Sequence, residues 1–167
     1  MDATEPCSEL LVPEMVTFLH GGLAAFLGTC GAGLVPALTR AYAPRVAPDR
    51  RAIDLFLGRT QAGACLANLA ARRPLAFTAG NVVDYRGLQI KGVSAGWQDA
   101  DAADVEWVDD YWRLFVANCQ RVELTAALIT SLRCRDLVRV TLVPTAIFRQ
   151  TPGPGAGSAV AEGTTWA

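Results

Sequence analysis

Residues 55–69 read LFLGRTQAGACLANL, a stretch in which a strand passes into a helix. Ala52 to Leu57 is an apolar run of strand length, and Cys65 and Leu69 lie at helical spacing. We expect the helix to stop at Arg72-Arg73-Pro74, because proline cannot continue it and the dipole favours cations at its end. The stretch therefore predicts a strand–helix junction centred on Gly58-Arg59-Thr60.

Strand-like runs lie on both sides of this junction. Residues 23–30 and 34–42 are joined by Gly31-Ala32-Gly33, which predicts an antiparallel hairpin. Further strands are expected at residues 75–78, 86–95 and 137–148, and helices at residues 13–19, 101–121 and 124–132. Because turns join most of these strands, the pattern favours an antiparallel barrel over a parallel doubly wound sheet. We predict the α+β class, mainly β.

Length and charge limit the possible functions. The chain has 167 residues and is 51% hydrophobic, which is enough for one well-filled core. Its net charge of -1 lacks the basic surplus of nucleic-acid-binding proteins, so no nucleic acid partner is expected. GxGxxG and Walker-type loops are absent from the sequence. We predict one barrel domain over residues 1–150 and a Pro/Gly-rich C-terminal tail over residues 151–167.

Cysteine and histidine usage indicates a cytoplasmic protein without a metal site. His20 is the only histidine, and the five cysteines are scattered without a CxxC pair: Cys7, Cys30, Cys65, Cys119 and Cys134. We therefore expect reduced thiols. The acids of residues 101–110 are expected to form a solvated helix face, since no histidine accompanies them.

Residues 15–39 are uncharged and long enough to cross a membrane, but their glycines suit a hairpin better than a spanning helix. We therefore expect no membrane segment. Asp2 and Glu5 stand where a secretory signal would carry basic residues, so no signal is expected either.

Gly58-Arg59-Thr60 is a candidate anion site. Backbone N–H groups at a helix start, the Thr60 hydroxyl and the Arg59 guanidinium could together hold a phosphate. In the alternative interpretation, Thr60 is an ordinary helix cap and Arg59 is a solvated side chain.

Other polar candidates lie on neighbouring strands. Arg40 and Arg45 lie in or just after the second strand, and alternation places Gln89 and Lys91 on one face of an apolar strand. If that face points outward, they are solvent-facing residues. If it points into a ligand groove, the Lys91 ammonium could contact a phosphate or the polar edge of a flavin ring.

The sequence resembles the pyridoxamine 5'-phosphate oxidase-like, FMN-binding split-barrel family over about residues 12–157. The resemblance is carried by residues 55–69, 73–77, 84–92 and 150–157. It implies a six-stranded antiparallel split β-barrel with flanking helices, a homodimer and FMN at the dimer interface. It also implies that Arg40 and Arg45 reach the flavin and its phosphate, with Arg59 and Thr60 beside the phosphate.

Several departures from the family pattern argue against true pyridoxamine-phosphate oxidase activity. Gln61-Ala62-Gly63-Ala64 replaces a Ser-Arg-Lys phosphate run, and Gly87 stands where the family has a flavin-contacting glutamine. The C-terminal tryptophan and arginine elements that hold the pyridoxal substrate have no counterpart in residues 137–157.

Three functions remain open. The first is a flavin-dependent oxidoreductase of unknown substrate. The second is a non-catalytic protein that holds a flavin or haem on the same dimeric barrel, with haem disfavoured because His20 is the only histidine. The third is a dimeric scaffold that has lost its cofactor. Candidate dimer anchors are Trp97, Trp107, Trp112 and Phe115, and residues 150–157 are either a loose tail or a lid over the cofactor.

Overall fold

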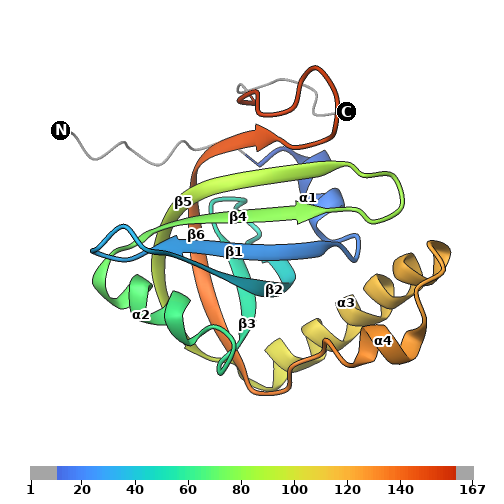
Figure 1. Cartoon of the computed structure of the whole chain (residues 1–167), viewed down its shortest axis with the longest axis horizontal. Helices are drawn as coiled ribbons and strands as arrows, with labels where there is room; N and C mark the ends of the chain where they lie inside the picture. The colour runs from blue at the N-terminus through green and yellow to red at the C-terminus, as the bar shows by residue number, and fades with distance from the viewer. Residues whose placement is uncertain (1–10, 161–167) are drawn as a thin grey trace.

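The computed structural model describes residues 11–160, which form six strands and four helices (Figure 1). The strands are β1 Ala24–Cys30, β2 Pro36–Val46, β3 Ile53–Gly58, β4 Pro74–Gly80, β5 Gly87–Asp99 and β6 Leu137–Arg149. The helices are α1 Pro13–Leu19, α2 Gly63–Ala71, α3 Ala102–Arg121 and α4 Ala126–Thr130. The predicted order of elements is confirmed, although β2 runs four residues further than the apolar pattern indicated.

The six strands form a closed antiparallel barrel in the order β1-β2-β3-β6-β5-β4. Consecutive strands form the hairpins β1–β2 and β4–β5, and β4 closes the barrel by pairing with β1 from Ala24↔Gly80 to Thr29↔Leu75. The predicted class and barrel are therefore confirmed.

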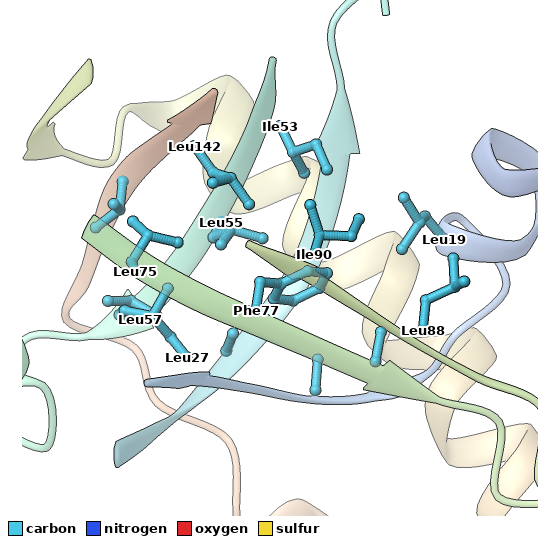
Figure 2. Packing of buried hydrophobic residues seen from close by; sticks show 14 of the residues in the cluster. Leu19, Leu27, Ile53, Leu55, Leu57, Leu75, Phe77, Leu88, Ile90 and Leu142 are labelled. Carbon is cyan, nitrogen blue, oxygen red and sulfur yellow. The ribbon is translucent and has the colours of Figure 1, made fainter. Parts of the chain in front are cut away.

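Apolar side chains at alternate strand positions fill the barrel interior, as the two-residue period of a strand requires. Leu27, Leu55, Phe77 and Ile90 come from four different strands and meet in this core (Figure 2). All four are fully buried. The intervening residues face outward, where helices cover only part of the barrel.

Helices α1, α2 and α3 occupy separate parts of the barrel surface, and α4 lies beside α3 (Figure 1). Helix α1 adds Met15 and Leu19 to the core cluster. Helix α2 packs near β1 and β2. Helix α3 lies outside β2 and buries Val108 and Tyr111 there. The outer faces of β1, β4 and the adjoining part of β5 therefore carry exposed residues.

The acids at the start of α3 differ from the solvated face that we predicted. Asp101 and Asp104 form a capping box, in which each side chain accepts a hydrogen bond from the other's backbone N–H. Asp104 is 1% exposed because this turn packs against the barrel, where Arg45 and Arg139 neutralise its charge. The solvated-face prediction is wrong for Asp104.

The described part of the predicted tail folds back onto β6. Arg149 N–H donates to the Ser158 carbonyl, Val160 N–H donates to the Ile147 carbonyl, and Phe148 forms a bridge with Ala159. Residues 161–167 of that tail, together with Asp2, Glu5 and Cys7, lie outside the described residues.

Two observations bear on membranes and thiols. No helix within residues 11–160 is long and apolar enough to cross a membrane. Cys30, Cys65, Cys119 and Cys134 are free thiols.

Candidate functional site

The outer face of β2, β1, β4 and β5 carries an open apolar groove of about 770 Å³. The small residues Gly28 and Ala76 line its middle, and its edges are formed by Leu38 on β2 and Lys91 on β5. Cross-strand register places these residues in one row, Leu38↔Gly28↔Ala76↔Lys91. We call this surface the outer groove.

A second hollow, which we call the cationic cleft, lies on the other side of Leu38. It measures about 400 Å³ and lies between β2, the residues that follow β3 and the α4–β6 loop. The polar residues that line it are Thr39, Arg40, Tyr42, Gln61, Ser131, Arg133 and Cys134. Because Leu38 lines both hollows, the cationic cleft adjoins the outer groove.

Two guanidinium groups give the cationic cleft its charge. Arg40 stacks on the Phe26 ring, 5.2 Å from its centroid, and forms no ion pair within residues 11–160. Arg133 is held between Tyr42 and Trp112, 5.9 Å from each ring centroid, and pairs with Asp109 at 2.7 Å. Arg40 is therefore the cation with uncompensated charge in the cleft, and Arg133 is a preorganised second donor.

Tyr42 also lines the cationic cleft. Its hydroxyl donates to the Leu132 carbonyl at 2.7 Å. Burial and a hydrogen bond with Cys134 raise the pKa of Tyr42 far above its ordinary value, despite the nearby arginines. Tyr42 therefore stays protonated at neutral pH, where it acts as a hydrogen-bonding group and not as a base.

Gln89 and Lys91 lie on the same outward face as Arg40. Gln89 occupies the row Arg40↔Phe26↔Thr78↔Gln89 and donates to the Thr78 hydroxyl at 3.4 Å. Lys91 is exposed, and its Nζ lies 4.7 Å from the Phe148 ring centroid. The fold thus brings three of the predicted site residues onto one surface.

Arg45 lies apart from this surface. It follows a bulge in β2 and turns toward α3, where it pairs with Asp54 at 3.0 Å and Asp104 at 2.7 Å. Its guanidinium also covers the Phe56 ring at 5.2 Å. Two carboxylates already compensate its charge, and it does not line the cationic cleft.

Arg59 and Thr60 adjoin the cationic cleft without lining it. The Arg59 guanidinium pairs with Asp99 at 2.6 Å and with Asp136 at 3.2 Å. The backbone N–H of Arg59 donates to the Asp136 carbonyl. Thr60 does not cap α2, because that helix begins at Gly63 without a side-chain cap. The backbone N–H groups expected to hold a phosphate here are partly occupied, because those of Ala62 and Gly63 donate to carbonyls within the turn.

Comparisons with known proteins find the same fold at low sequence identity. No protein-family model matches the chain, and no curated protein matches it. Group A Streptococcus HupZ is 14% identical with a TM-score of 0.53, over 89% of this chain and 99% of HupZ. An F420 reductase is 18% identical with a TM-score of 0.54, over 81% of this chain and 98% of the reductase. A pyridoxamine 5'-phosphate oxidase-like protein from Lactobacillus delbrueckii is 12% identical with a TM-score of 0.52, over 86% and 97% of the two chains.

The chain has the pyridoxamine 5'-phosphate oxidase-like split-barrel fold. These likenesses establish the architecture, and the chemistry has to be argued from this chain's own residues.

In this split-barrel chain, sequence reasoning missed Arg133 and the residues around it. Arg133, Cys134 and Arg135 stand between a short helix and the last strand, and two cations flanking a thiol in a loop were the available signal. The position of these residues depends on the pairing of β6 with β3, which places the α4–β6 loop beside Arg40.

The other candidates from the sequence have structural partners. His20 Nε2 accepts a hydrogen bond from Val46 N–H at 3.2 Å, so its lone pair is occupied and unsuited to an axial haem ligand. Trp107 donates to the Ala43 carbonyl, and the Trp112 ring packs at a tilt against Phe115 within the chain. Of the four aromatic residues suggested as dimer anchors, only Trp97 is a large exposed side chain.

Proposed function

We propose that this chain binds FMN as a homodimer and works as a flavin-dependent oxidoreductase on a substrate still to be identified. The observation that carries the proposal is that the cationic cleft adjoins the outer groove at Leu38. One end of this surface suits a phosphate and the other suits a flat apolar ring system, which are the two parts of FMN.

The phosphate is assigned to the cationic cleft. Arg40 offers an uncompensated guanidinium, and Arg133 offers a second one held by aromatic rings. The side chains of Ser131 and Gln61 add neutral hydrogen-bonding groups in the same hollow. Charge-assisted bonds from guanidinium to phosphate are among the strongest that a protein surface makes.

The ring system is assigned to the outer groove. A planar ring can lie flat over Gly28 and Ala76, because neither residue carries a side chain beyond a methyl group. Lys91 at the edge of the groove is placed to contact the polar rim of such a ring, with Gln89 in the adjoining row. When bound, the isoalloxazine supplies the electron transfer, and the protein supplies orientation and charge.

The exposure of this surface supports the proposal of a homodimer. The outer groove is open to solvent, whereas cofactor sites usually bury most of the ligand. Large apolar side chains are exposed around it, among them Leu34, Val35 and Leu38, the last of them 70% exposed. A second copy laid over the groove would cover both these residues and the ring.

Two alternatives use the same surface. The chain could hold a flavin without catalysing a reaction, because Tyr42 remains protonated and no base is evident in the cationic cleft. F420 is an alternative flavin-type cofactor, since one structure of the same fold is an F420 reductase. Consumption of a nicotinamide or F420 electron donor by the purified protein would distinguish catalysis from storage.

The cofactor assignment is tested by titrating FMN and riboflavin into the protein. Arg40→Gln should weaken FMN binding about tenfold to a hundredfold and leave riboflavin binding unchanged, because riboflavin lacks the phosphate. Arg51→Gln removes the same charge from the exposed β2–β3 turn and should change neither affinity. A purified protein that is colourless and does not bind added FMN would exclude the proposal.

The assembly is tested by sedimentation. The chain should sediment at about twice its 17.7 kDa mass. Leu38→Asp in the outer groove should yield monomers and weaken FMN and riboflavin alike. Leu128→Asp, at an exposed position on α4, serves as the control. A stable monomer that retains flavin would contradict the shared site.

A further inference from the structure

A third hollow, the α3–α4 cleft, lies on the far side of Arg133 from the cationic cleft. It measures about 480 Å³, which suits a small organic molecule. Helix α4 is held against α3 through Ile129, which packs with Phe115 and Cys119. Arg133 lines both hollows, so its side chain borders each of them.

Positive charge predominates in the α3–α4 cleft. Three guanidinium groups line it, from Arg113 on α3 and from Arg133 and Arg135 after α4, against a single lining carboxylate, Asp109. Asp109 is already paired with Arg133. Arg113 pairs with Asp110, which lies outside the lining.

Arg135 is the group that gives this cleft its capacity for an anion. Its side chain is exposed, and no carboxylate within residues 11–160 pairs with it. An uncompensated guanidinium beside two paired ones is suited to a carboxylate or phosphate.

Apart from Thr130, the remainder of the cleft is apolar. Val105 and Val116 line it together with the Trp112 indole. Trp112 is held in place by tilted contacts with Tyr42 at 5.8 Å and Phe115 at 5.1 Å, so its ring is a fixed surface. An inorganic ion would leave this apolar area uncovered, whereas an organic anion would bury it.

We propose that the α3–α4 cleft binds a small organic anion with a flat apolar body, its charged group at Arg135 and its body against Trp112. This site is separate from the flavin surface and does not depend on it. Because Arg133 borders both hollows, an anion bound here lies next to the proposed phosphate site, the arrangement expected of a substrate or effector of the same protein.

The probe for this site is 1-naphthoate, with uncharged 1-naphthylmethanol as the matched ligand. Trp112 reports binding through its indole N–H signal in a proton–nitrogen spectrum, assigned with Trp112→Phe. We expect a saturable shift with 1-naphthoate, a weaker one with the alcohol, and loss of affinity as sodium chloride is raised.

Arg135→Gln should weaken 1-naphthoate binding about threefold to tenfold, and Arg51→Gln should leave it unchanged. Arg135→Gln should bind FMN as the wild type does, and Arg40→Gln should bind 1-naphthoate as the wild type does. A loss at one site can therefore be told apart from a loss at the other. Equal binding of naphthoate and the alcohol, or unchanged naphthoate affinity in Arg135→Gln, would overturn the proposal.

Discussion

Arg139 and Asp104 form a two-point ion pair, in which Nη1 of Arg139 lies 2.9 Å from each carboxylate oxygen of Asp104. Arg45 adds a third hydrogen bond to the same carboxylate at 2.7 Å. The pair joins β6 to the first turn of α3, and Arg45 extends it to β2. It therefore attaches α3, which forms one wall of the α3–α4 cleft, to the barrel.

Asp104→Asn should destabilise the fold by about 2–4 kcal/mol, because it leaves the partly buried Arg139 guanidinium without its counter-charge and leaves Arg45 with Asp54 alone. Urea denaturation measures the change. Asp110→Asn removes an exposed carboxylate from an ion pair on the same helix and should cost less than about 1 kcal/mol. Similar losses in the two variants would show that the buried pair is not what holds α3.

Stability should fall in acid through the same carboxylate. Burial disfavours ionisation of Asp104 most strongly, but hydrogen bonds from Arg45 and the Asp101 backbone, with the charge of Arg139, outweigh it and hold the pKa below its ordinary value of 3.8. A lowered folded-state pKa means that the stabilisation is complete above 3.8 and is lost as the pH falls through the folded value. Unfolding free energies measured from pH 7 down to pH 3 should decline less steeply in Asp104→Asn than in the wild type. Parallel curves would count against this assignment.

Tyr111→Phe should cost about 1–3 kcal/mol. The Tyr111 hydroxyl donates to the Leu19 carbonyl at 3.0 Å and accepts from Leu23 N–H at 2.9 Å, so its removal leaves two buried backbone groups unpaired. Tyr85→Phe is the control, because that ring is 69% exposed. The midpoint of thermal unfolding should drop in Tyr111→Phe alone.

Gly92→Ala should destabilise the barrel by about 1–3 kcal/mol, since an added methyl group would overlap the Val143 carbonyl where β5 bulges against β6. Gly63→Ala, at the first position of α2, meets nothing within 4 Å and should be neutral or stabilising by up to about 1 kcal/mol. Equal stability of the two variants would contradict the close approach of β5 and β6.

The elements of this protein were predictable because their signals are local. A two-residue apolar period, glycine turns and Pro74 after the α2 segment are properties of a few adjacent residues, and each element lies close to where those signals placed it. Gln89 and Lys91 share a face for the same reason, since alternation along one strand requires no knowledge of its neighbours.

The site depended on charges that meet across the barrel. Arg59 resembled a free cation in the sequence, yet Asp99 and Asp136 lie 40 and 77 residues away and reach it only through the folded chain. Arg45 likewise meets Asp104, which is 59 residues away. The sequence by itself determined the strands, the helices and the shared face of Gln89 and Lys91, because backbone periodicity is local. Only the tertiary structure decided that Arg40 and Arg135 are the uncompensated cations of their clefts, because the carboxylates that neutralise the other arginines are brought to them largely by long-range strand pairing and by the packing of α3 against the barrel.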